Sequence, residues 1–84
     1  MIKDMKTQSM YDLILKNINQ VKENLGIKVI SSYSGGDNVF QIDDDKNYVT
    51  YKLSFNPNYF DSNEECIGET LIDNCLVYYA IGEG

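Results

Sequence analysis

The chain lacks histidine and tryptophan, and all seven of its basic residues are lysines, so arginine is absent as well. Without histidine, catalysis by an imidazole general base is excluded. A zinc site would have only Cys66 and Cys75 as sulfur ligands, whereas structural zinc takes four ligands, mostly cysteine or histidine. A Cys66 nucleophile would have Glu64, Glu65 and Glu69 as neighbours and no basic residue to lower its pKa. We therefore expect no enzyme activity, no metal site and no cofactor.

Long apolar runs are missing too. No segment reaches the roughly 18 apolar residues that span a bilayer, and residues 1–4 are too polar and short for a signal peptide. We therefore expect a protein of the cytoplasm of a bacterial host cell, without membrane contact. In that reducing compartment, Cys66 and Cys75 are expected as free, buried thiols, although pairing between neighbouring strands stays open. Residue types with AT-rich codons dominate, which favours a low-GC bacterium or its phages.

Positive charge is scarce in the second part of the chain. Residues 1–34 carry five lysines against three carboxylates, whereas from residue 35 onward two lysines stand against ten carboxylates. No basic residue follows Lys52, so the later carboxylates have no basic partner near them in sequence. A one-sided negative field of this kind attracts basic partners and repels nucleic acid. We therefore expect no direct binding of nucleic acid.

A periodic apolar pattern near the N-terminus predicts one helix. Ser9 is a favourable N-cap, Asp12 follows three residues later, and Gly26 suits a left-handed residue after the last turn. Residues 1–8 are expected as a lead-in. The apolar stripe recurs at spacings of three and four and consists of Met10, Leu13, Ile14, Ile18, Val21 and Leu25.

After Gly26 the apolar period changes to two, which predicts strands. The expected strands are residues 27–33, 39–42 and 48–55, separated by turns at 34–37 and 43–47. Asn56-Pro57-Asn58 is expected to end the third strand, and an acidic loop over 58–65 follows. Residues 66–81 are expected to form a hairpin that turns at Asp73-Asn74. The last strand of this hairpin is expected to be central in the sheet and partly covered on both faces. With 84 residues in one domain, 1–84, the expected fold is α+β: one N-terminal helix on a four- to five-stranded, mainly antiparallel, meander-like sheet.

Two acidic segments begin like calcium loops and then depart from the pattern. Asp43, Asp45 and Asn47 have the opening spacing, but Tyr48 and Ser54 occupy the positions that require glycine and glutamate. A second such start at Asp61, Asn63 and Glu65 fails in the same way, at Cys66 and Ile72. Both segments are therefore predicted to be charged turns.

The same segments are the best candidates for contact with a partner. Tyr59 and Phe60 are adjacent, so both cannot face inward, and one of them is expected as an exposed aromatic anchor beside the carboxylates. We predict a partner-binding face formed by Asp43, Asp44, Asp45, Tyr59, Phe60, Asp61, Glu64, Glu65, Glu69 and Asp73.

In size, charge and composition the chain is similar to phage-encoded inhibitors, namely anti-CRISPR proteins and glycosylase inhibitors that mimic DNA. This resemblance implies a small acidic inhibitor of phage origin that occupies the nucleic-acid site of a basic nucleic-acid-processing enzyme, because such sites recognise phosphate largely through Lys and Arg. Two alternatives stay open: an immunity protein or antitoxin that neutralises a basic toxin, and a small structural protein that self-assembles through an edge strand at residues 76–81. A net charge of −6 also suits a domain that merely stays soluble. The partner and the choice between monomer and homodimer remain open.

Overall fold

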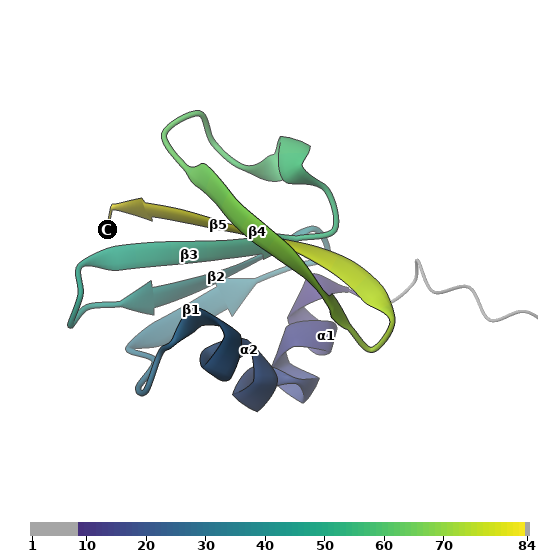
Figure 1. Cartoon of the computed structure of the whole chain (residues 1–84), viewed down its shortest axis with the longest axis horizontal. Coiled ribbons are helices and arrows are strands. Elements are labelled where there is room, and N and C mark those ends of the chain that lie inside the picture. The colour runs from purple at the N-terminus through teal and green to yellow at the C-terminus, as the bar shows by residue number, and fades with distance from the viewer. Residues whose placement is uncertain (1–8, 84) are drawn as a thin grey trace, which may run out of the picture.

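The computed structural model describes residues 9–83, so the lead-in predicted for residues 1–8 lies outside the described residues. Two short helices, α1 (Met10–Lys16) and α2 (Ile18–Leu25), precede an antiparallel sheet of five strands (Figure 1). The α+β prediction is confirmed. The strands are β1 (Ser32–Gly35), β2 (Val39–Asp44), β3 (Val49–Ser54), β4 (Glu65–Ile72) and β5 (Cys75–Glu83), and a short 3-10 helix, η2 (Pro57–Tyr59), follows β3.

The strand order is β1-β2-β3-β5-β4, so the first three strands form a meander and the last hairpin places β5 inside. β5 pairs with β3 on one side and with β4 on the other, which confirms its predicted central position. The suggestion that residues 76–81 supply a free edge for self-assembly is therefore wrong. The edge strands of the described sheet are β1 and β4.

The predicted single helix is interrupted at Asn17. Its backbone leaves the helical region, with φ −115° and ψ 28°, and its side-chain amide donates to the Leu13 carbonyl at 2.9 Å and to Asp73 Oδ2 at 3.0 Å. Asparagine commonly offers the backbone such alternative hydrogen bonds, which ends the helix. Both outer limits follow the prediction: Ser9 Oγ accepts from the Asp12 N–H at 3.1 Å, and Gly26 has φ 72°.

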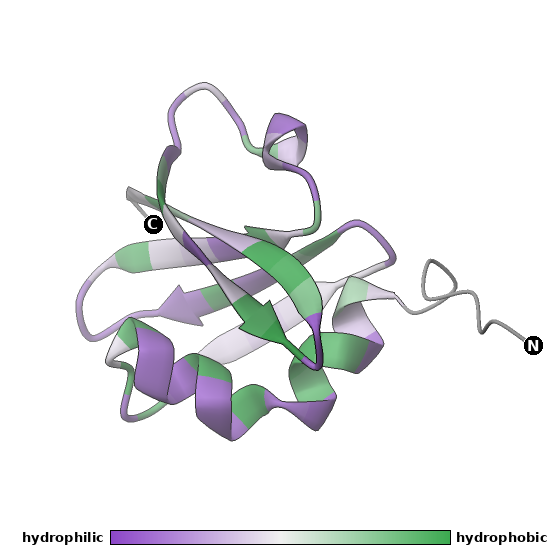
Figure 2. Ribbon diagram, turned by 45° about the vertical axis from the view of Figure 1, so that its right-hand side comes forward, coloured by the Kyte–Doolittle hydropathy of each residue, from purple (hydrophilic) through white to green (hydrophobic). Residues whose placement is uncertain are grey.

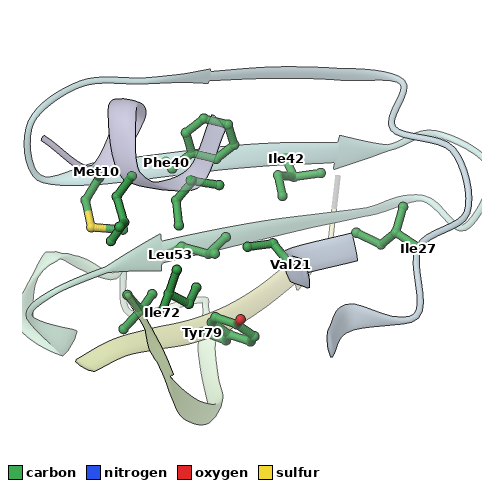
Figure 3. Packing of buried hydrophobic residues seen from close by; sticks show 11 residues of the cluster. Met10, Val21, Ile27, Phe40, Ile42, Leu53, Ile72 and Tyr79 are labelled. Carbon is green, nitrogen blue, oxygen red and sulfur yellow. The ribbon is translucent and has the colours of Figure 1, made fainter. Parts of the chain in front are cut away.

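The hydrophobic core lies between the two helices and one face of the sheet (Figure 3). Fully buried side chains come from α1 and α2 and from strands β2 to β5, so each of these elements is held by the same cluster. Burial of one such side chain stabilises the fold by roughly 1.5–3 kcal/mol before conformational entropy is counted. The cluster consists of Met10, Leu13, Ile14, Val21, Ile27, Phe40, Ile42, Leu53, Ile72, Val77 and Tyr79.

The opposite face of the sheet is partly covered by residues 55–64, which rise on the side away from the helices (Figure 1). Ser54 and Ala80 point to this face and are nevertheless fully buried. The Ser54 hydroxyl donates to the Asn38 carbonyl at 2.6 Å and accepts from the Asn56 N–H at 3.2 Å, which ties the start of the segment to the sheet. The prediction that β5 is covered on both faces is confirmed for this part of the strand.

Two predicted boundaries are wrong. The first strand begins at Ser32, not at residue 27, because Ile27 enters the core while Val29 stays exposed in the connection. Asp43 and Asp44 belong to β2 and not to the following turn, since they pair with Thr50 and Val49 of β3.

Candidate partner-binding surface

The acidic segment before β4 contacts one basic residue, Lys52, whose side chain projects from β3 on the face opposite the helices. Lys52 Nζ lies 3.1 Å from Asp61 Oδ2 and 3.2 Å from Glu64 Oε2. Glu64 Oε1 accepts from the Asp61 N–H at 2.8 Å, so the two acidic residues are also joined to each other. Asp61 and Glu64 thus have a basic partner in the fold, although none lies near them in sequence. Lys52 precedes them by several residues in sequence, and only the sheet brings it beneath them.

Lys52, Asp61 and Glu64 together form the Lys52 cluster, and its electrostatics favour the charged form of the lysine. Desolvation acts to lower the pKa of Lys52, but its hydrogen bonds and charge interactions with Asp61 and Glu64 outweigh that effect and raise the pKa above its ordinary value. The Glu64 side chain is only 9% exposed and that of Asp61 is 68% exposed. Glu64 therefore holds the segment in place, whereas Asp61 still presents its carboxylate to solvent.

Asp73 is also paired. Its Oδ2 lies 3.5 Å from Lys16 Nζ and accepts from the Asn17 amide at 3.0 Å, so the β4–β5 turn is joined to the helix junction. The Asn17 hydrogen bond, aided by Lys16, lowers the pKa of Asp73 below its ordinary value. As with Asp61 and Glu64, the basic partner of Asp73 is distant in sequence.

The three aspartates at residues 43–45 have three different environments. Asp44 is 3% exposed and caps the turn after β2: its Oδ1 accepts from the Lys46 N–H, and its Oδ2 accepts from the Asn47 amide at 2.8 Å. The prediction that Asp44 belongs to the binding face is therefore wrong, because its carboxylate is buried. Asp43 is half-buried within a polar network on β1, β2 and β3, whereas Asp45 is exposed. The donors to Asp43 are Ser32, Gln41 and Thr50.

Glu65 and Glu69 remain as exposed carboxylates on β4, and neither forms an ion pair within residues 9–83. Between them, the register shifts between Cys66 and Gly68, and Ile67 stands 49% exposed at this irregularity. The sequence analysis did not single out Ile67. The available signal was an apolar residue with a glutamate two positions before it and another two positions after it. The sequence did not show which edge of β4 pairs, so it did not show that this residue is exposed.

Tyr59 and Phe60 divide as predicted. Tyr59 is 48% exposed in η2, while Phe60 is half-buried. Figure 2 shows hydrophilic residues through most of the segment from β3 to β4 and apolar residues at the C-terminal end of β4.

A groove of about 430 Å³ lies between α2 and β4. Its lining combines apolar and aromatic residues with polar ones and consists of Asn24, Leu25, Tyr51, Ile67, Gly68, Glu69, Thr70, Tyr79 and Ile81. The Tyr79 hydroxyl accepts from the Asn24 amide at 3.0 Å. Burial raises the pKa of both Tyr51 and Tyr79. Both phenols are therefore neutral near pH 7, so the tyrosines contribute contact area and hydroxyl groups to the groove and no charge.

Within residues 9–83, no group of three or more Cys, Asp or Glu side chains is arranged to hold a metal ion. Both cysteines are free thiols; Cys66 lies opposite Ala80 and Cys75 opposite Ile72, at the two ends of the β4–β5 hairpin. Cys75 is half-buried but Cys66 is exposed, so the expectation of two buried thiols is wrong. No described helix has the length and apolar character needed to cross a membrane.

Comparison of the chain with protein-family models, curated proteins and solved structures found no match.

Proposed function

We propose that the protein is a small acidic binding protein that docks on a basic nucleic-acid-processing enzyme and excludes that enzyme's nucleic acid. The observation that carries the proposal is the pair Glu65 and Glu69, exposed along one edge strand without an ion-pair partner among residues 9–83. Sites that bind nucleic acid are lined with Lys and Arg, and exposed carboxylates compete with phosphate for those cations.

The surroundings of the two glutamates support binding to a protein. Ile67 and Tyr59 are exposed near the acidic residues of β4 and of the segment before it. Protein interfaces combine an apolar centre, often with tyrosine, and a polar rim. The docking surface proposed here consists of Tyr59, Asp61, Glu65, Ile67 and Glu69. Compared with the sequence prediction, it lacks the carboxylates that the fold uses internally, namely Asp43, Asp44, Glu64 and Asp73. It also lacks Asp45, which is exposed in the β2–β3 turn, and it keeps Asp61, which pairs with Lys52 but remains 68% exposed.

Capture from a low-GC bacterial lysate, followed by competition with DNA, tests the proposal. The bait is the full chain, beside a Glu65→Gln/Glu69→Gln variant and a matched control, Asp12→Asn/Glu23→Gln, which removes the same charge from exposed positions on the helices. We expect the parent and the control to retain a nucleic-acid-binding enzyme that salt or DNA releases, and the β4 variant to retain much less. Retention that DNA does not displace, or equal retention by the β4 variant, contradicts the proposal. Capture of a toxin nuclease would instead identify the protein as an immunity protein or antitoxin.

Self-assembly is a second candidate because the other edge strand is neutral. β1 has the sequence Ser-Tyr-Ser-Gly, all four residues are exposed, and none is charged. Charged residues on edge strands normally prevent pairing between copies, and β1 has no such protection. If this edge mediates assembly, sedimentation of the parent shows a dimer that Ser34→Lys dissociates. A monomer at all concentrations excludes this candidate.

A further inference from the structure

β4 is an eight-residue edge strand that is hydrogen-bonded only on the side of β5 within the described sheet. The hairpin turns at Asp73 and Asn74, with φ of 50° and 65°, and Ile72 faces Cys75 across this two-residue turn. In such a hairpin the flanking pair is hydrogen-bonded and the pattern alternates along the strand. The backbone N–H and C=O groups of Leu71 and Glu69 are thus directed away from β5.

Part of this edge is already occupied. The Gln20 side-chain amide of α2 donates to the Leu71 carbonyl at 3.3 Å, which covers the end of β4 near the turn. Towards the other end, no side chain or backbone group of another described element bonds to the outward side at Glu69. An unpaired edge of this kind is a template for an additional strand.

The groove between α2 and β4 runs alongside this free part of the edge. Residues 67–70 of β4 line it, including Glu69, together with Tyr79 and Ile81 of β5. A strand added to β4 would direct alternate side chains to the groove side, where Leu25, Tyr79 and Ile81 offer apolar contact beside the polar Asn24 and Thr70. The hollow therefore fits an apolar side chain of the added strand.

The charges at the edge select the occupant. Glu65 faces Ile81 in the register and Glu69 faces Tyr78, so the two carboxylates lie on opposite faces of the sheet. A basic segment would meet a carboxylate on each face. A second copy of the chain would add a β4 strand that carries the same two carboxylates and no lysine or arginine, so neither Glu65 nor Glu69 would gain a cationic partner.

We propose that the free part of the β4 edge binds an extended basic segment of the partner protein as a sixth strand, with apolar residues in the α2–β4 groove and lysine or arginine beside Glu65 and Glu69. This inference rests on the proposed function and specifies how the partner is held. Backbone hydrogen bonds supply affinity in such strand addition, and the alternate side chains supply specificity.

The test uses a heptapeptide of alternating lysine and valine, titrated into the full chain, with an alternating glutamate–valine peptide as control. When the valines of the bound peptide face the groove, its lysines lie on the other face of the sheet, beside Glu69. Two variants separate charge from backbone: Glu69→Thr and Glu69→Pro both remove the carboxylate, but only proline removes the outward N–H, a change that edge strands tolerate. Circular dichroism and thermal unfolding establish that both variants are folded. We expect Glu69→Thr to weaken binding about 3- to 10-fold at low salt, and Glu69→Pro to weaken it at least about tenfold more. In the parent chain, the Glu69 amide should become protected from hydrogen exchange when the lysine peptide is added and should stay unprotected when the glutamate peptide is added.

Each outcome decides between the proposals. Equal binding by Glu69→Pro and Glu69→Thr would overturn strand addition and leave a docking surface that acts through charge. Failure of the lysine peptide to bind would also overturn strand addition, while DNA-displaceable capture from the lysate would still support the proposed function. Peptide binding without such capture would support the strand site and contradict inhibition of a nucleic-acid enzyme. A dimer of the free protein that Glu69→Pro dissociates would assign the edge to a second copy and overturn the basic-partner proposal.

Discussion

Glu64 Oε2 lies 3.2 Å from Lys52 Nζ, and the Glu64 side chain is only 9% exposed although it belongs to the most acidic part of the chain. The lysine side chain is 17% exposed, so both charges are largely withdrawn from water. A charge in such a position is stable only when it is paired. The contact fastens the segment before β4 to the sheet and leaves Glu65 and Glu69 as the carboxylates available on β4.

Replacement of Lys52 by methionine should destabilise the fold by about 1–3 kcal/mol, because Glu64 then remains as a largely buried charge without its partner. The change in the free energy of unfolding is measured by urea denaturation. Lys46→Met is the matched control, since Lys46 is exposed and forms no ion pair with residues 9–83, and its effect should stay within about 0.5 kcal/mol. Equal effects of the two substitutions would show that the Lys52 cluster does not hold the segment.

Asp73→Asn should remove a pH-dependent part of the stability while keeping the turn, since asparagine tolerates the positive φ at this position. The pKa of Asp73 is lower in the folded chain than its ordinary value of 3.8. The carboxylate's contribution is therefore fully present above pH 3.8 and is lost as pH falls through the lower folded-state pKa. Urea midpoints of parent and variant should differ at pH 6 and converge in strong acid.

Asp45→Asn provides the control for that comparison, because Asp45 is exposed and its carboxylate has no hydrogen-bond or ion-pair partner among residues 9–83. Its difference from the parent should show a weaker dependence on pH than that of Asp73→Asn. The same pH dependence for both variants would contradict a specific role of Lys16 and Asn17 at Asp73.

Asn17→Ala should cost about 1 kcal/mol, because the amide side chain then no longer bonds to the Leu13 carbonyl and to Asp73. The matched substitution Asn19→Ala lies on an exposed helical position, where alanine has the higher helix propensity, so it should be neutral or slightly stabilising. Thermal unfolding of both variants measures the difference. If Asn17→Ala were the more stable of the two, the break between α1 and α2 would owe nothing to this side chain.

Gly35→Ala should destabilise the protein by about 1–3 kcal/mol through crowding. A Cβ atom at residue 35 would lie 2.9 Å from the Val39 carbonyl oxygen and 3.0 Å from the Phe40 Cα, and these backbone atoms can only move with the β1–β2 turn. Gly36→Ala is the control, since its Cβ would meet no atom within 4 Å. Urea denaturation should rank Gly36→Ala close to the parent, and the reverse order would contradict the described packing of the turn.

The elements that sequence reasoning located correctly depend on short-range geometry. Ser9 and Gly26 delimit the helical region because one caps the first turn with its hydroxyl and the other adopts a positive φ. Asp73 and Asn74 form the last turn because both adopt the left-handed region that asparagine and aspartate tolerate. The interruption of the helix at Asn17 was not predicted, because the Asn17 amide donates to Asp73, which is far along the chain.

The candidate site could be predicted only in part. Exposure of Glu65 and Glu69 and of one residue of the Tyr59-Phe60 pair agrees with the charge and aromatic pattern. Asp44 looked equivalent to its neighbours in sequence, yet its position opposite Val49 buries it beneath the turn that it caps. Sequence reasoning had no means to distinguish these carboxylates, because burial depends on which face of the sheet each residue occupies.

By itself the sequence determined the α+β composition, the limits of the helical region, the last hairpin and the excess of negative charge, since these depend on residue type, period and local dihedral angles. The tertiary structure decided which carboxylates are free. Insertion of β5 between β3 and β4 makes β4 an edge strand, and packing of residues 55–64 over the sheet brings Asp61 and Glu64 to Lys52. Ion pairs and strand edges depend on proximity in space, which the order of the strands establishes and the order of the residues does not.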